Sequence, residues 1–403
     1  GPEDSLATRN YSGTEKIRIN PDLPGEYRVQ LYAKDRRDVC NAKIIRFGVT
    51  VNTPYAGALA ARKFSVDDAK KFSHLNAISA DKTWEYAQGE GVTIAIIDSG
   101  VNYNHPDISQ NIKINLAEIP GNGKDDDKNG FVDDAYGYDF ASEDEFPLDD
   151  SGHGTHVASL AASAVFGVAP KAKILPIKVF NAFGGADMGT LSAGIRYAVD
   201  MGADVINCSL GMRVDKEKGF PEVLESALEY AKSKNVIVAA AAGNGDYRGV
   251  GYDIDRKPYA PASSTSSNVV SVASTKRDGS LASYSNFGRK TVDLGAPGGS
   301  QVDGDLLGAH YLPEIRLYEG HSGTSMATPV VSGTFALLKS IAPKANHQVL
   351  IDTLIESGVE VLELKLRIKS GKMIDTLTAV RKLKSAIEKQ AEQSTHSMDL
   401  SAR

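Results

Sequence analysis

The chain has 403 residues, of which 41% are hydrophobic and 24% charged, a balance that supports a packed globular core and excludes a wholly disordered protein. Its net charge of −6 is small for this length, and no dense block of Lys and Arg indicates a nucleic-acid partner. No apolar run approaches the ~18 residues needed to cross a bilayer, so no membrane span is predicted.

Two cysteines, Cys40 and Cys208, exclude a disulfide framework. They could form a single bridge, but Cys208 ends an apolar run at residues 204–208, where a buried free thiol is the favoured interpretation. The Gly1-Pro2 start resembles the scar of a cleaved tag, so the missing signal peptide carries no weight in assigning a compartment.

Residues 1–55 are predicted to form a small β-rich N-terminal segment. Residues 26–33 alternate in strand fashion, and residues 44–51 form a second β-rich run after a polar turn. Because two strands cannot bury a useful core alone, this segment is expected to pack on the main domain or to belong to a larger module. Residues 56–90 are interpreted as a linker with a lead-in helix at 66–72.

A different pattern begins at residue 91 and indicates an α/β domain over residues 91–385. Near-continuous apolar runs predict strands buried on both faces, at 92–97, 174–180, 203–210, 236–242 and 269–273. Helical patterns lie between them, at 153–164, 190–201 and 221–234, and a long helix is predicted at 325–341. Strands that alternate with helices predict a mostly parallel, helix-covered sheet. An amphipathic stretch at 373–391 overlaps a polar tail at 386–403.

Asp98 and His153 are the first candidates for chemistry. Asp98 ends the first buried strand, at the edge where open α/β sheets place their sites, although an Asp there is also common as a turn residue. His153 lies between two glycines, which leave room for a substrate backbone. His156, three residues on, is expected to pack behind the site as a hydrogen-bonded core residue rather than to bind a metal with His153.

Ser325 and Asn244 complete the candidate set. Ser325 precedes Pro329 at the predicted start of a helix, where free N–H groups and the helix dipole stabilise negative charge, although a plain helix cap is the alternative. Asn244 stands between two glycines just after a buried strand. It is either a turn residue or a carboxamide donor to an oxyanion.

Five segments taken together resemble the signatures of the subtilase family, over about residues 75–385. They are Asp98-Ser99-Gly100, Gly152-His153-Gly154-Thr155-His156, Ser209-Leu210-Gly211, Gly243-Asn244 and Gly323-Thr324-Ser325-Met326-Ala327-Thr328-Pro329. The order Asp, His, Ser is the subtilisin order. The resemblance implies a three-layer α/β/α fold and serine endopeptidase activity on protein or peptide substrates.

The resemblance also implies a role for each residue. Ser325 would be the nucleophile, His153 the general base, and Asp98 the group that orients His153, while Asn244 and the Ser325 N–H would bind the oxyanion. Ser209, Leu210 and Gly211 resemble the edge that pairs with a substrate strand. With residues 240–243, among them Ala241 and Gly243, they would line a roomy apolar pocket for an apolar or aromatic side chain before the cut.

An Asp-rich stretch at residues 121–134 predicts a structural calcium site. Asp125, Asp127 and Asn129 alternate before Gly130, as in the first half of a calcium loop. The Glu expected at the twelfth position is missing, and Asp133 is the proposed substitute. A solvated acidic turn without a cation is the alternative.

Several further expectations rest on the family resemblance. It implies a secreted or cell-envelope protein, a monomer, and an inhibitory prodomain of which residues 1–55 could be a remnant, with an accessory β-module as the alternative. An inactive subtilase fold used as a scaffold, and an esterase that uses the same triad, are the rival functions. The intact triad argues against the first, and the substrate-strand segment argues against the second.

Overall fold

The computed structural model describes residues 25–34, 40–49 and 72–401, except for 182–183, 216, 218, 247, 301 and 303. The chain divides into two units, residues 1–62 and 63–403. In the first unit, β1 (Gly25–Lys34) and β2 (Cys40–Val49) pair antiparallel, with Gly25 opposite Val49. Both predicted strands are therefore present, and the second begins earlier than predicted. The helix predicted at 66–72 lies outside the described residues apart from Phe72.

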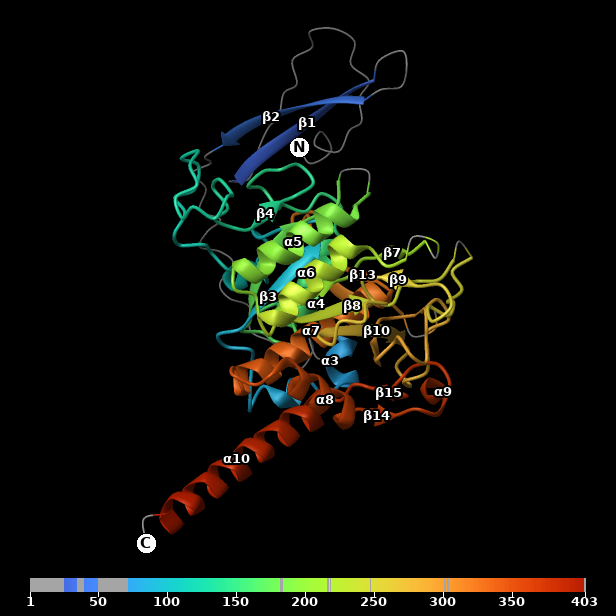
Figure 1. Cartoon of the computed structure of the whole chain (residues 1–403). Coiled ribbons are helices and arrows are strands. Elements are labelled where there is room, and N and C mark those ends of the chain that lie inside the picture. The colour runs from blue at the N-terminus through green and yellow to red at the C-terminus, as the bar shows by residue number, and fades with distance from the viewer. Residues whose placement is uncertain are drawn as a thin grey trace. The chain divides into compact units, whose positions relative to one another are not determined.

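The second unit is built on a nine-stranded sheet in the order β14-β15-β11-β10-β8-β6-β3-β5-β4 (Figure 1). Every pairing in it is parallel except that of β14 with β15. Its strands are β3 (Thr93–Asp98), β4 (Tyr138–Asp139), β5 (Lys173–Lys178), β6 (Val205–Cys208), β8 (Ile237–Ala241), β10 (Val269–Thr275), β11 (Leu294–Pro297), β14 (Val359–Glu360) and β15 (Lys372–Met373). The sheet confirms the predicted mostly parallel α/β class.

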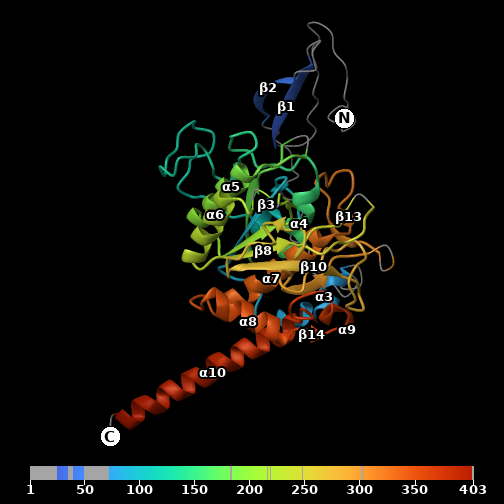
Figure 2. The ribbon, with the colours of Figure 1, turned by 45° about the vertical axis from the view of Figure 1, so that its right-hand side comes forward.

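The sheet is covered by helices on both faces, which gives the three predicted layers (Figure 2). Alternate residues of β3 explain the arrangement, because Ile94 and Ile96 join one apolar core while Ala95 and Ile97 join the other. The first core includes α4 (His153–Ala162), α7 (Thr324–Ile341), α8 (His347–Ser357) and the start of α10 (Thr376–Ser401), and the second includes α5 (Met188–Asp200) and α6 (Glu222–Ser233).

Short elements complete the unit. They are α3 (Ser73–Ala77), α9 (Leu362–Lys365), two 3-10 turns at Asp81–Thr83 and Ser109–Asn111, and two small antiparallel pairs, β7 (Met212–Arg213) with β9 (Tyr259–Ala260) and β12 (Leu306–Ala309) with β13 (Tyr318–His321). Within the described residues, no helix is both long and apolar enough to cross a membrane.

The C-terminal helix extends beyond the predicted amphipathic stretch. That stretch is predicted at residues 373–391, whereas α10 begins at Thr376 and continues unbroken to Ser401. Its early residues Ala379, Val380 and Leu383 are buried, whereas Ile387 is exposed, so the helix leaves the apolar core after its second turn. Residues 386–401 include no proline or glycine, so nothing in this stretch ends a helix that has already started.

The strand order places β3 at a switch point. The chain leaves β3 for β5 on one side and later returns through β6 on the other side. At such a point the connections that leave the strands diverge, so a crevice opens at the carboxyl ends of the strands. Asp98, the last residue of β3, stands at that edge.

Candidate active site

Asp98 and His153 are joined directly. The imidazole Nδ1 of His153, the first residue of α4, donates to Asp98 Oδ1 over 2.7 Å. The N–H of Ser99 donates to the same oxygen, also at 2.7 Å. Asp98 is completely buried, and its Oδ2 has no partner among the described residues. This arrangement places the proton on Nδ1 of His153 and leaves Nε2 as the basic atom.

The environment of His153 favours its protonated form. Burial by itself lowers the pKa of His153, but the charge of Asp98, the hydrogen bond to Asp98 and the charge of Asp149 together raise the pKa above its usual value. A His with a raised pKa holds a proton well once it has taken one. The pair is therefore suited to accept a proton from a neighbouring hydroxyl.

Asp149 supports this pair, although no motif in the sequence singles it out. Its buried carboxylate lies before α4 and accepts hydrogen bonds from five donors, which are the Ser99 and Thr155 hydroxyls and the N–H groups of Ser151, Gly152 and Thr155. The pKa of Asp149 is raised, because the effect of burial exceeds that of these hydrogen bonds, which lower the pKa. Since Ser99 follows Asp98, one carboxylate fixes both the end of β3 and the start of α4.

Ser325 lies in the first turn of α7, one residue after the observed helix start at Thr324. Its hydroxyl donates to the carbonyl of Ser209 over 2.9 Å. Among the described residues it makes no hydrogen bond to His153. A rotation about the Cα–Cβ bond would therefore be needed to bring the hydroxyl to His153 Nε2.

The carbonyl of Ser325 has an unusual partner. In an α-helix it would accept from the N–H four residues later, but that residue is Pro329, which has no N–H. The hydroxyl of Ser209 supplies the missing donor at 2.7 Å. Ser209 and Ser325 thus exchange two hydrogen bonds, hydroxyl to carbonyl in each direction.

A buried chain of polar groups orients Ser209. The hydroxyl of Ser332 donates to Asn207 Oδ1 over 2.8 Å, and Asn207 Nδ2 donates to Ser209 Oγ over 2.9 Å. All three side chains are buried, so each depends on these partners in place of water. This series of hydrogen bonds links β6 to α7 and fixes the backbone that carries Ser325.

Asn244 follows β8 in a loop and presents its amide to the same space. Its Oδ1 accepts from the N–H and the hydroxyl of Thr324, at 2.8 and 2.9 Å. Because the oxygen is held this way, the Nδ2 end of the exposed side chain is left as a donor. Asn286, which the sequence did not single out, supports the loop by donating to the Ala242 carbonyl and accepting from Gly245 N–H.

Two cavities meet at these residues. One of about 470 Å³ and one of about 560 Å³ both include His153, Asn244 and Ser325 in their linings. The larger also contains the predicted substrate segment, Ser209, Leu210 and Gly211, with Ala241 and Gly243. The smaller extends over Asp305, His321 and Tyr284. The structure therefore brings His153, Ser325, Asn244 and the predicted substrate-binding residues into one cleft, with Asp98 buried behind His153.

One large side chain borders the predicted pocket between residues 209–211 and 240–243. The ring of Tyr259 lines the larger cavity and packs against both Gly211 and Gly243. The prediction of a roomy pocket rests on the small residues of the two walls and does not include this ring.

His156 packs behind the site, as predicted. Its Nε2 donates to the carbonyls of Leu306 and Glu319, at 3.1 and 3.2 Å, and its ring stacks on that of His321 with centroids 4.5 Å apart. Burial, with His321 and His153 nearby, lowers the pKa of His156 to about 3. It is therefore neutral. Cys208 is a buried free thiol, and burial raises its pKa.

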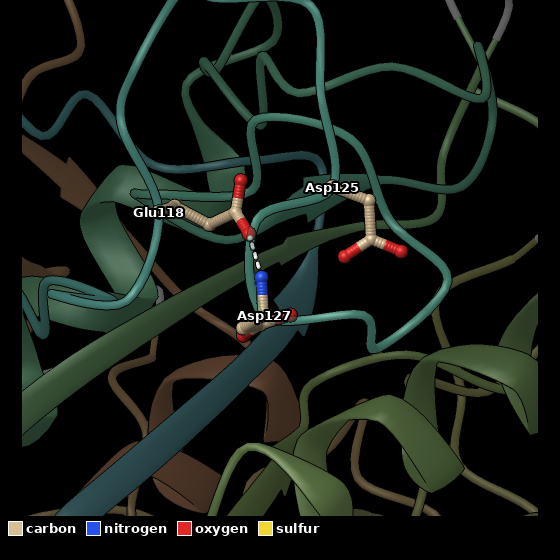
Figure 3. Close-up of side chains that lie close together, drawn as sticks. All are labelled: Glu118, Asp125 and Asp127. Carbon is tan, nitrogen blue, oxygen red and sulfur yellow. Dashed lines mark hydrogen bonds between the residues drawn. The ribbon is translucent and has the colours of Figure 1, made fainter.

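The acidic loop forms a cluster different from the predicted one. Glu118, Asp125 and Asp127 each place a carboxylate oxygen within 4.8 Å of the others (Figure 3). Glu118 Oε1 accepts from the N–H groups of Asp126 and Asp127, while its buried Oε2 has no partner among the described residues. Glu118 precedes the Asp-rich repeat, so the spacing of the repeat gives no signal for it.

Of the two other predicted ligands, Asp133 takes no part in this cluster, whereas Asn129 adjoins it and donates from its N–H to Asp125 Oδ1 and Asp127 Oδ1, at 3.1 and 3.0 Å. The carboxylate of Asp133 accepts from the N–H groups of Asn122 and Gly123, at 3.0 and 2.8 Å. Asn129 uses its side-chain oxygen to accept from Phe131 N–H. Both side chains are thus used in closing the loop itself.

Comparison with known proteins gives a consistent result. The subtilase family profile matches residues 89–383. Thermitase from Thermoactinomyces vulgaris is 35% identical over 276 residues, which cover 67% of this chain and 82% of thermitase. Subtilisin-like protease 1 of Plasmodium falciparum is 32% identical over 293 residues, covering 68% of this chain. The match spans only 41% of that protein's length.

Solved structures agree with the sequence relatives. A cold adapted subtilisin-like serine proteinase has a TM-score of 0.55 and 29% identity, over 70% of this chain and 90% of its own. The epidermin leader peptide processing serine protease of Staphylococcus aureus has a TM-score of 0.63 and 26% identity, over 79% of this chain and 82% of its own.

The His153–Asp98 pair predicts a pH titration that NMR of imidazole-labelled protein can follow. We expect His153 to titrate above its usual 6.5, and its pKa to fall in Asp98→Asn, where the carboxylate charge is gone. Because the folded pKa is raised, this pairing contributes stability that is fully present below pH 6.5 and is lost as pH rises through the folded pKa.

His74 provides the internal control for this titration. It is buried elsewhere in the unit, and burial lowers its pKa to about 4. We expect its titration to be the same in wild type and in Asp98→Asn. A His153 pKa that does not change on removal of the Asp98 charge would contradict the pairing.

Proposed function

The chain belongs to the subtilase family of subtilisin-like serine endopeptidases, and from this premise we propose that Ser325, His153 and Asp98 form its catalytic triad. The observation that carries the proposal is the 2.7 Å bond from His153 to a fully buried Asp98, in a cleft that also contains a helix-start serine. Asn244 is proposed as the oxyanion donor beside them.

In the proposed reaction, Ser325 Oγ attacks the carbonyl carbon of the scissile peptide bond while His153 Nε2 takes the hydroxyl proton. The resulting imidazolium is stabilised by Asp98 and then gives its proton to the leaving amine, which produces an acyl-enzyme. A water molecule, deprotonated by His153 in the same way, releases the acyl group and restores Ser325. The raised pKa of His153 supports the first proton transfer, and the leaving amine, which is more basic than imidazole, takes the proton in the second.

The oxyanion of the tetrahedral intermediate would be held by two donors. One is Asn244 Nδ2, which Thr324 orients by binding the opposite end of the amide. The other is the N–H of Ser325, which lies in the first turn of α7 and has no partner within the helix. Both donors are fixed before substrate arrives, so little reorganisation is needed when charge develops.

Peptides are the substrates that the cleft fits best. Two cavities that meet at Ser325 can accept chain on both sides of the bond that is cut. The segment at residues 209–211 lies along one of them, in position to pair with an extended peptide as an added strand. An esterase needs neither the second cavity nor the strand segment, and a scaffold needs no orienting bonds around Asn244.

We also propose a structural calcium ion at Glu118, Asp125 and Asp127. Carboxylate oxygens are the ligands that calcium prefers, and three from one loop would repel each other without a cation. The buried Oε2 of Glu118, which has no partner among the described residues, is the specific sign that a ligand belongs there. The ion would hold the loop at residues 118–134 and takes no part in peptide cleavage.

Ser325→Ala tests the nucleophile. We expect it to abolish labelling by a serine-directed phosphonate and to reduce kcat for casein or peptides by about 10⁶-fold, as in subtilisin. The matched control is Ser233→Ala at the exposed end of α6, which should keep both activities. Hydrolysis of small esters with no cleavage of any peptide would contradict an endopeptidase.

Ser209→Ala tests whether the carbonyl of Ser325 must be held. The variant removes the donor to the Ser325 carbonyl and the acceptor of the Asn207 amide. Loss of the first bond alone should lower kcat by about 2- to 12-fold, since such a bond is worth about 0.5–1.5 kcal/mol, while KM changes little. Ser209→Thr keeps a hydroxyl and should restore most of kcat. A KM effect without a kcat effect would show instead that Ser209 acts only in substrate binding.

Chelation tests the calcium proposal. A ligand that binds only the folded protein at 100 times its Kd adds about 2.7 kcal/mol of stability, so EDTA should lower the Tm and added calcium should restore it. Glu118→Gln keeps an oxygen for the N–H groups of Asp126 and Asp127 but loses a charged ligand. We expect this variant to lose most of the calcium-dependent shift.

The control for the chelation test is Asp352→Asn on the exposed face of α8, away from the loop. It removes one carboxylate and should keep the full shift in Tm. An identical wild-type Tm with calcium and with EDTA would show that the cluster is a solvated acidic turn.

A further inference from the structure

We infer that Tyr259 closes the first specificity pocket, so that the enzyme selects peptides with a small side chain, such as Ala, Gly or Ser, immediately before the scissile bond. This inference rests on the proposed function. The residue belongs to β9, a two-residue strand far from the catalytic residues in sequence. Its ring reaches the cleft beside Ser325 and Asn244.

The pocket is bounded by two walls that lack large side chains. One wall is formed by residues 209–211 and the other by residues 241–243, and members of both line the same cavity as Ser325. At Gly211 and Gly243 each wall has no Cβ, which leaves a flat slot between the two backbones. A slot of this kind would admit a flat or long side chain if it were empty.

The Tyr259 ring occupies that slot. A Cβ built on Gly211 would lie 2.4 Å from Cε1 and 3.0 Å from Cδ1 of Tyr259, and one on Gly243 would lie 3.0 Å from Cε1 and 3.1 Å from Cζ. The ring is therefore in close contact with both walls. A substrate side chain that enters between the walls meets the ring, and only a short one fits above it.

The ring is fixed in this position from two sides. The Tyr259 hydroxyl donates to the Gly211 carbonyl over 2.8 Å, and the backbone of β9 pairs with β7, where Arg213 lies opposite Tyr259. Burial and the nearby Tyr252 raise the pKa of Tyr259 to about 12, although the charge of Arg213 acts in the opposite direction. The hydroxyl is therefore protonated at neutral pH and always available as a donor.

Displacing the ring would cost the substrate binding energy. To admit Phe or Leu, the enzyme would have to break the bond to Gly211 and move the ring out of contact with both walls. A small side chain needs neither change. The walls themselves consist of Ser, Leu, Gly and Ala, which offer no charge to attract Lys, Arg, Asp or Glu in that position.

The test uses peptide nitroanilides that differ only in the residue before the cleaved amide, Ala or Phe. We expect wild type to have a kcat/KM at least about tenfold higher for Ala, since a pocket discriminates by about 10- to 200-fold for a single methylene. Tyr259→Gly should empty the slot and reverse the preference to Phe. Rates are expressed per active site titrated with a phosphonate, so that misfolded protein does not affect the ratio.

Two further variants separate the ring from the hydroxyl and from general effects. Tyr259→Phe keeps the ring and should keep the preference for Ala, whereas Tyr259→Ala should behave like Tyr259→Gly. Tyr252→Phe, a change to another tyrosine of the same region, should leave the ratio unaltered. The inference is overturned if wild type cleaves the Phe peptide as well as the Ala peptide, or if Tyr259→Gly retains the wild-type ratio. If neither peptide is cut by wild type, the proposed function itself fails.

Discussion

The hydrogen bond between His153 and Asp98 is the contact on which the site depends. It joins the last residue of β3 to the first residue of α4, so the imidazole is placed only if strand and helix are both in register. Asp149 keeps that register by binding Ser99 after the strand and Thr155 within the helix. A buried charge with several donors is stable in one geometry and costly in any other.

A second arrangement places the serine. The proline in the first turns of α7 leaves the Ser325 carbonyl without its helical donor, and the hydroxyl of Ser209, the residue after β6, takes the place of that donor. Because Ser325 in turn donates to the Ser209 carbonyl, the substrate-binding segment and the nucleophile are joined by two hydrogen bonds. These bonds tie the start of the helix to the segment after β6, which favours a constant distance between a bound peptide and Ser325.

The cleft also shows how specificity can be separated from catalysis. The groups that would perform the chemistry come from strand ends and helix starts, which the sheet fixes. The group that limits the first pocket, Tyr259, comes from a short surface pair, β7 with β9. A change there alters the shape of the pocket without touching the bonds around His153, Asn244 or Ser325. Substrate preference can thus diverge between relatives that share the same catalytic arrangement.

The sequence by itself determined the parallel sheet, its covering helices and the identity of the candidate catalytic residues. Apolar runs mark strands buried on both faces. Asp98 and Asn244 stand at or just after strand ends, and His153 stands between two glycines at a helix start, because local backbone requirements are written in neighbouring residues. The importance of Asp149, Glu118 and Tyr259 became visible only in the tertiary structure. Their importance comes from partners distant in the chain, such as Ser99 for Asp149 and Gly211 for Tyr259. Periodicity and spacing carry no information about such contacts, since packing of whole elements brings them together.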